Sequence, residues 1–102
     1  MEKFRTELTD KLFSGILKLE TEEECYKFFE DICTIKEIKE IAQRLEVARL
    51  LEEGRAYNDV AKQTGASTAT ISRVNKCISY GSGGYKIVLD RMKNERDSKN
   101  AK

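Results

Sequence analysis

One long apolar stripe constrains the fold of this 102-residue chain more than any other feature. Apolar residues recur every three or four positions between residues 35 and 51, which is the spacing of one face of an α-helix. Thr34 and Glu37 form a capping-box sequence before the stripe, and Gly54 has the position of a helix-terminating glycine. A helix of roughly 19 residues is close to 30 Å long, so a partner helix must cover its apolar face. The stripe consists of Ile35, Ile38, Ile41, Ala42, Leu45, Ala48 and Leu51.

The rest of the chain is also patterned for helices, and it contains no proline that would interrupt them. Spacings of three and four predict a first helix over about residues 3–18, and a Thr-x-x-Glu capping sequence at 21–24 opens a second one. Two shorter helical segments follow at 57–64 and 67–79. A glycine-rich loop at 81–84 then precedes a last helix. We therefore predict an all-α fold with about six helices.

The length fits one domain, which we place at residues 1–95, and the polar end at residues 96–102 is expected to be disordered. No apolar run approaches the ~18 residues that a membrane span requires. The N-terminal residues have no apolar stretch, so we expect no export signal. The cysteines are odd in number and lack zinc-type spacing, so we expect a cytoplasmic protein with reduced, mostly buried thiols and no metal. They are Cys25, Cys33 and Cys77.

The charges are distributed unevenly along the chain, although the formal net charge is only +1. Residues 1–53 carry 9 basic and 14 acidic side chains, whereas residues 54–102 carry 10 basic and 4 acidic ones. Such asymmetry indicates an anionic partner for the second half. Part of the basic excess lies in the polar tail, where a solvated chain end explains it as well.

Residues 57–76, with the sequence YNDVAKQTGASTATISRVNK, fit a helix-turn-helix. A small residue is needed where the two helices touch, and Ala61 occupies that position. The turn needs a residue that tolerates a left-handed backbone, and Gly65 supplies it. Branched apolar residues must anchor both helices to the core, and three are correctly spaced: Val60, Ile71 and Val74. The alternative interpretation is an ordinary αα-hairpin with a polar face.

The second helix of this segment has side chains suited to DNA at its leading end. Ser67 is a good N-cap, the next residues are short enough to enter a groove, and Arg73 and Lys76 suit phosphate or guanine contacts. Because two cations are few, Arg55, Lys62 and Lys86 would have to supplement them. The predicted contacts to double-stranded DNA are Ser67, Thr68, Ala69, Thr70, Ser72, Arg73 and Lys76.

The run from Gly65 to Arg73 closely resembles the recognition segment of the tryptophan repressor family. Thr34, Glu37, Arg44 and the Leu-Leu-Glu-Glu-Gly stretch at 50–54 add to the resemblance. Tyr-Gly-Ser-Gly-Gly-Tyr at 80–85 is more similar to the YerC/YecD-type branch of Trp-repressor-like proteins. The resemblance extends over about residues 4–95 and is densest over 34–85.

This resemblance implies six helices in an intertwined homodimer, whose N-terminal and long third helices interlock. Such a partner would cover the apolar stripe at 35–51. Two recognition helices would then enter successive major grooves, with half-sites about 34 Å apart on a palindromic site. The implied function is sequence-specific regulation of bacterial transcription, with repression as the sense of control by family analogy.

The resemblance also implies a small-molecule effector site, in which an aromatic ligand lies between two arginines. Arg44 and Arg73 match the two arginines, and Thr34 matches a residue at the floor of the site. Val74 stands where the family has glycine and takes up space, while Cys77 replaces a polar serine. We therefore predict that free tryptophan is not the ligand, and another small ligand or none stays open. An exposed Arg44 paired with Glu40 is the alternative.

Catalysis is not expected, because the chain has no histidine, no metal-ligand cluster and no nucleophile beside a base. No cofactor is indicated either. The competing function is a helical dimeric protein-interaction module without significant DNA binding. DNA binding predicts an affinity that falls steeply with salt and depends on Arg73, whereas a protein partner predicts neither.

Overall fold

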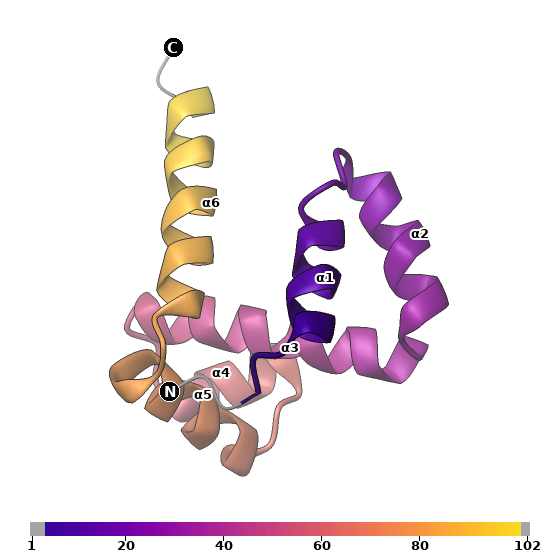
Figure 1. Ribbon diagram of the computed structural model, residues 1–102. Helices are drawn as coiled ribbons and strands as arrows, with labels where there is room; N and C mark the ends of the chain where they lie inside the picture. Colours follow the sequence, from indigo (N-terminus) through magenta and orange to yellow (C-terminus); the bar gives the residue numbers. More distant parts are fainter. Residues whose placement is uncertain (1–3, 101–102) are drawn as a thin grey trace. The chain divides into compact units, whose positions relative to one another are not determined.

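The computed structural model describes residues 4–100, with side chains as far as residue 96. In this part of the chain six α-helices follow one another without a strand, which confirms the all-α prediction (Figure 1). The chain divides into two compact units, Met1–Ile38 and Lys39–Lys102, with the boundary inside the third helix. The helices are α1 (Glu7–Ile16), α2 (Glu22–Ile32), α3 (Ile35–Glu52), α4 (Tyr57–Thr64), α5 (Thr68–Tyr80) and α6 (Gly84–Asn100).

Helix α1 is shorter than the predicted helix at 3–18, because a capping box fixes its start. The backbone N–H of Thr9 donates to the Thr6 hydroxyl at 3.2 Å, and the Thr6 N–H donates to the Thr9 hydroxyl at 2.8 Å. This reciprocal pair satisfies two amides that the first turn leaves without helical partners. The helix therefore begins at Glu7, and it ends at Ile16.

Helix α2 has half of the capping box that its sequence predicts. The Thr21 hydroxyl accepts from the Glu24 N–H at 3.1 Å, but the Glu24 carboxylate accepts from the N–H of Glu20 instead of Thr21. The rings of Phe28 and Phe29 are edge to face, with centroids 5.4 Å apart. None of the residues of α1 or α2 is buried, so both helices have apolar surface without cover.

Helix α3 begins with the capping box predicted from the sequence. Thr34 N–H donates to the Glu37 carboxylate at 2.8 Å, and Glu37 N–H donates to the Thr34 hydroxyl at 3.0 Å. The predicted cover of the stripe by a partner helix stays a prediction, because within one chain the stripe is only partly buried. The buried residues of α3 are Val47, Ala48 and Leu50, and only Ala48 belongs to the stripe. Ile41, by contrast, is 52% exposed.

The core of the C-terminal unit forms where the second half of α3, the α4–α5 pair and α6 meet (Figure 1). Helix α5 contacts both α4 and α6. The burial of branched apolar side chains stabilises this arrangement, since each removes a large apolar area from water. The buried residues are Val47, Ala48, Leu50, Val60, Ala66, Ile71, Val74 and Leu89.

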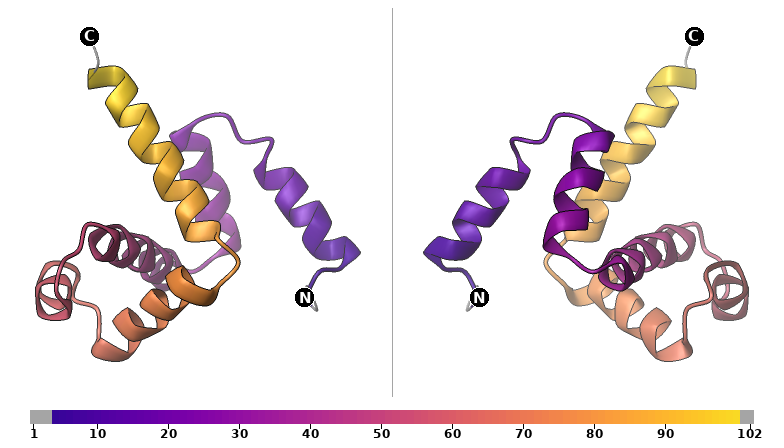
Figure 2. Two further views of the ribbon diagram at one scale, coloured as in Figure 1. Left: turned by 90° about the vertical axis from the view of Figure 1, so that its left-hand side faces the viewer. Right: turned by 90° about the vertical axis from the view of Figure 1, so that its right-hand side faces the viewer.

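Helix α6 joins this core through its first turns and then extends away from the α4–α5 pair (Figure 2). Leu89 is buried, whereas Met92 is 51% exposed. The disordered end at residues 96–102 stays a prediction: the helix continues through Asn100, and residues 101 and 102 lie outside the described residues. No helix within the described residues is long and apolar enough to cross a membrane.

Candidate nucleic-acid interface

Residues 57–80, called here the reading head, form the helix-turn-helix that the sequence predicts. Helix α4 ends at Gly65, whose φ of 75° and ψ of 7° lie in the left-handed region. The Gly65 N–H donates to the carbonyl of Ala61 at 2.8 Å, which closes the last turn of α4. The chain then turns into α5, and Ser67 is the N-cap of that helix.

Side-chain hydrogen bonds fix the turn on both sides. The Thr64 hydroxyl donates to the carbonyl of Val60 at 2.8 Å and accepts from the N–H of Ala66 at 3.1 Å. From α3, the amide Nε2 of Gln43 donates to the carbonyl of Thr64 at 3.1 Å. Sequence reasoning missed Gln43, because its partner lies 21 residues away and no local pattern connects them.

The predicted anchors of the reading head are buried. Val60 is 0% exposed, and Ile71 and Val74 are each 1% exposed. They pack in one cluster with Val47 and Leu50 of α3. The head is therefore held against α3 by apolar contacts from both of its helices, which gives α5 a defined orientation.

Six of the seven predicted DNA contacts at α5 and its N-cap are exposed. Thr70 is half-buried, and Ser67 is exposed but engaged, because its hydroxyl accepts from the Thr70 N–H at 3.1 Å. The Ser67 hydroxyl also lies 3.1 Å from the Thr70 hydroxyl. The α5 sequence contains no acidic residue, and a helix N-terminus favours an anion. The exposed contacts besides Ser67 are Thr68, Ala69, Ser72, Arg73 and Lys76.

The supplementary cations are less available than the sequence suggests. Arg55 donates to Asp59 at 2.9 Å and lies 3.7 Å from Glu53. Lys86 pairs with Asp90 at 3.4 Å. These exposed ion pairs are weak and can exchange for phosphate. Lys62 is exposed and forms no ion pair with any of the described residues, so it stays the best supplement to the cations of α5.

Arg49 on α3 joins two acidic residues of its own helical region. It donates to both carboxylate oxygens of Glu46 at 3.0 and 2.7 Å, and to Glu53 at 2.6 Å. The hydrogen bond from Arg49 lowers the pKa of Glu46, and the same bond raises the pKa of Arg49. This arginine is therefore paired with two acids of its own helical region, and it lies outside residues 57–80.

A small cavity lies between α3, α5 and α6. Its volume is about 160 Å³, and we call it the three-helix cavity. Four of the five predicted effector residues line it, whereas Thr34 does not and instead caps α3. No ion pair between Arg44 and Glu40 occurs in the described part of the chain, so that alternative is not supported. The lining residues are Arg44, Thr70, Arg73, Val74, Cys77 and Tyr85.

Two lining residues were not predicted for this site: Thr70, which was predicted only as a DNA contact, and Tyr85. Burial raises the pKa of the Tyr85 hydroxyl, Cys77 adds to the rise, and Arg44 and Arg73 oppose it. The prediction that the cysteines are mostly buried is wrong in this chain: Cys25 and Cys77 are exposed, and Cys33 is half-buried. Cys77 nevertheless borders the cavity, because α5 places it one turn after Arg73.

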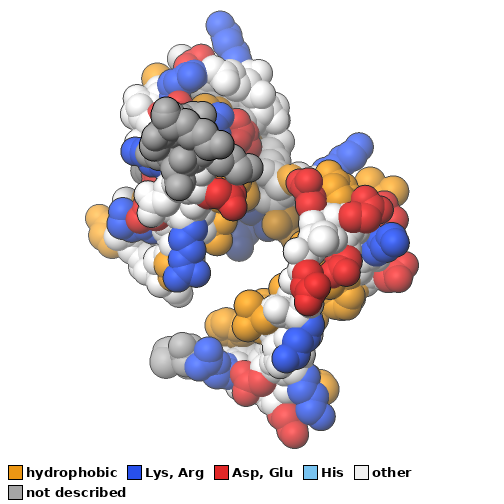
Figure 3. Space-filling view, turned by 90° about the horizontal axis from the view of Figure 1, so that it is seen from above, with side chains coloured by type: hydrophobic (Ala, Val, Ile, Leu, Met, Phe, Trp, Pro, Cys, Tyr) orange, Lys and Arg blue, Asp and Glu red, His pale blue; other side chains and the backbone are white. Residues whose placement is uncertain are grey.

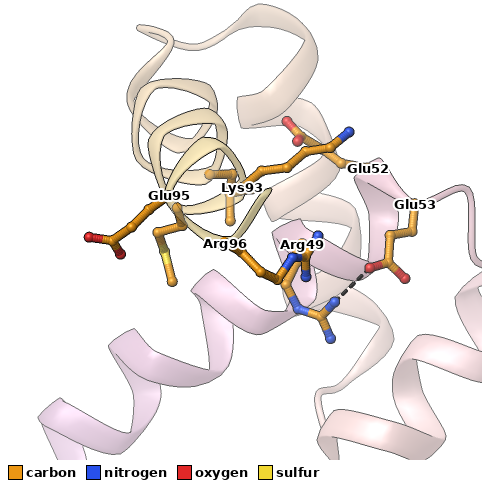
Figure 4. A pocket seen from close by; sticks show the side chains of 8 residues that line it. Arg49, Glu52, Glu53, Lys93, Glu95 and Arg96 are labelled. Atoms are coloured by element: carbon orange, nitrogen blue, oxygen red, sulfur yellow. Dashed lines mark hydrogen bonds and ion pairs between the residues drawn. The ribbon is translucent and has the colours of Figure 1, made fainter. Parts of the chain in front are cut away.

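A larger cleft of about 410 Å³ separates the end of α3 from α6. Figure 4 shows charged side chains of both signs around it, with Arg49 bonded to Glu53. Leu89 and Met92 contribute its apolar surface. Because its acids and bases can pair with each other, the cleft does not select one charge of ligand, and it resembles an uncovered helix face more than a ligand site.

Comparison with known proteins decides the family. The model of the Trp repressor protein family matches residues 7–93. The chain belongs to the Trp repressor family. It is also 51% identical over 102 residues to the uncharacterized protein YerC of Bacillus subtilis (strain 168), covering 100% of this chain and 98% of YerC. This family is regulatory rather than enzymatic.

Two crystal structures share the fold of this Trp repressor family member. A candidate Trp repressor from Staphylococcus aureus has a TM-score of 0.87 and 48% identity, covering 90% of this chain and 92% of that chain. A TrpR-like protein from Eubacterium eligens ATCC 27750 has a TM-score of 0.86 and 51% identity, covering 90% and 95%. These similarities confirm the family resemblance noted in the sequence.

Gly65→Ala is expected to destabilise the reading head by about 1–2 kcal/mol, the cost of a left-handed conformation for a residue with a Cβ. Gly84→Ala is the matched control, because an added Cβ there would meet nothing within 4 Å and its φ is not positive. Thermal unfolding followed by circular dichroism measures both. Equal melting temperatures for the two variants would contradict the role assigned to Gly65.

Proposed function

We propose that this protein is a homodimeric transcriptional regulator that reads a palindromic DNA site through α5. The observation that carries the proposal is the outer face of α5: short exposed side chains and two cations, without an acidic residue, on a helix anchored by buried residues. A rigid recognition helix with this composition suits the major groove. Family membership supports the same function at a coarse level.

The exposed apolar surface of the N-terminal unit supports a second copy of the chain as its partner. Part of this surface is open to solvent among charged side chains in Figure 3. Apolar patches of this kind mark interaction surfaces in proteins. The large exposed residues of α1, α2 and their flanks are Phe4, Leu8, Leu12, Phe13, Leu17, Tyr26 and Ile32.

A dimer of this kind carries two reading heads related by a two-fold axis. Its site would therefore be palindromic, with half-sites about 34–36 Å apart. We assign repression as the sense of control and the bacterial cytoplasm as the place of action by family analogy. Free tryptophan is not proposed as effector, because a cavity of about 160 Å³ is smaller than the roughly 300 Å³ at which ligand pockets begin.

The test begins with a random pool of DNA duplexes, from which the purified protein selects its preferred sequence. The selected duplex is then titrated by fluorescence anisotropy. The expected result is a palindromic motif, bound at least roughly 100-fold more weakly at 200 than at 50 mM salt if four or more phosphates are contacted. Arg73→Ala is expected to weaken binding by about 10- to 100-fold.

Arg91→Ala is the control, since it removes an exposed arginine of α6 and leaves the reading head intact. Its affinity for the selected duplex should remain within about twofold of the wild type, because it makes no contact at the base edges. If no motif is enriched, and if the residual DNA affinity depends neither on salt nor on Arg73, sequence-specific DNA binding is refuted. A helical protein-interaction module would then be the better account.

A further inference from the structure

Tyr85 reaches the three-helix cavity from the first turn of α6. Its side chain is half-buried against the core, whereas the neighbouring Tyr80 is 86% exposed. The phenol lines this cavity together with Arg44 of α3 and Arg73 of α5, and both arginines lie close enough to act on the pKa of its hydroxyl. An aromatic side chain of the protein itself thus borders the site in which the family resemblance implies an aromatic ligand.

The connection between α5 and α6 fixes the position of this tyrosine. The Gly81 N–H donates to the carbonyl of Cys77 at 2.8 Å, and a Cβ at Gly81 would lie 2.4 Å from that same oxygen. The backbone of residue 81 therefore lies so close to the last turn of α5 that only glycine fits there. Three residues later α6 begins, and Tyr85 follows in its first turn.

The remaining volume leaves little room for a second ring. About 160 Å³ stays free beside Tyr85, below the roughly 300 Å³ at which ligand pockets begin. Val74 of α5 is one of the residues that bound this space. An aromatic ligand would have to displace the tyrosine, which would remove its apolar ring from the core.

We propose that Tyr85 is a positioning residue that replaces an aromatic effector: its ring fixes α5 against α3, so that the reading head is ready for DNA without a free ligand. This inference rests on the proposed function for its consequence in DNA binding. Its structural part, the fixed position of α5, is independent of DNA. If α5 is docked on α3 in nearly all molecules, a ligand cannot increase the docked fraction further.

Tyr85→Ala tests the proposal, together with p-cresol, which is the tyrosine side chain as a free molecule. Amide hydrogen exchange followed by mass spectrometry reports the docking of α5. The variant should exchange α5 amides about tenfold faster than the wild type, because its head is docked for a smaller fraction of the time. Millimolar p-cresol should reverse this change, since an emptied apolar cavity can bind an aromatic molecule.

Two further variants separate positioning from general stability. Tyr80→Ala should leave α5 exchange unchanged, because that side chain is almost fully exposed. Tyr85→Phe keeps the ring and should behave like the wild type. In DNA titrations, Tyr85→Ala should bind about tenfold more weakly until p-cresol is added, following the loss of the docked fraction.

The wild type provides a test that does not depend on the folding of any variant. Free tryptophan, tyrosine and phenylalanine should neither slow α5 exchange nor tighten DNA binding. Protection of α5 by any of them would overturn the proposal, and so would a Tyr85→Ala variant with wild-type exchange. Should the wild type bind no DNA, the proposed function fails, while the exchange measurements still decide the role of Tyr85.

Discussion

Leu50→Ala is expected to lower the free energy of unfolding by about 2–5 kcal/mol, the range for a leucine deleted from a packed core. Leu50 is 0% exposed and lies in the cluster that joins α3 to the reading head. Its side chain packs in the same cluster as Ile71 and Val74 of α5. A loss of this size is a large share of the roughly 5–15 kcal/mol that stabilises a typical domain.

Urea denaturation followed by circular dichroism, at one fixed protein concentration, measures this loss. Leu50→Met is the matched control, because it conserves volume and should cost less than about 1.5 kcal/mol. A Leu50→Ala variant as stable as the Leu50→Met variant would show that the core does not depend on this contact.

The reading head was predictable from sequence because its constraints are local. A left-handed residue, a small contact residue and buried anchors must occur at fixed spacings within twenty positions, and Gly65, Val60 and Ile71 meet that demand. The helix caps are equally local, and the box at Thr34 and Glu37 forms as its sequence predicts. For residues within one or two helical turns, the spacing in the sequence alone determines their relative positions.

The face of α3 that packs on the head could not be predicted in the same way. Its last turns are apolar on more than one side, so that periodicity alone selects a stripe without saying what covers it. Packing of α4 and α5 buries Val47 and Leu50, which lie beside the predicted stripe. The stripe residue Ile41 stays uncovered in the single chain.

The lining of the three-helix cavity was likewise predictable within one helix and not predictable between distant segments. Arg73, Val74 and Cys77 lie within two turns of α5, and their common position follows from helical spacing. The participation of Tyr85 depends on the path of the chain through the glycine turn at 81–84, which no periodicity describes. The hydrogen bond from Gln43 to the turn is likewise a contact between distant segments.

Ile41→Glu is expected to abolish the proposed dimer and reduce the helix content of the protein. In the single chain this substitution should be harmless, because Ile41 is 52% exposed, surface changes usually cost within about 0.5 kcal/mol, and glutamate is a good helix former. In an intertwined dimer the same side chain belongs to the covered stripe. An unpaired carboxylate buried there costs several kcal/mol.

The loss of helix content should be large, because it involves the whole N-terminal unit. Ordering each backbone residue costs roughly 1–2 kcal/mol, and no residue of α1 or α2 is buried within the chain to offset that cost. These helices therefore depend on a partner for their apolar contacts. Without the dimer, we expect α1 and α2 to lose their helical structure while the C-terminal core persists.

Sedimentation equilibrium and circular dichroism measure both consequences. The wild type should have twice the 11.7 kDa mass of one chain, and its melting temperature should rise with protein concentration, as for an obligate dimer. The Ile41→Glu variant should sediment as a monomer with lower helicity. Lys39→Glu, a charge change at an exposed neighbouring position, should remain dimeric. A monomeric wild type that keeps its full helicity would refute the dimer, because the N-terminal helices would then be stable without the apolar cover that they lack within one chain.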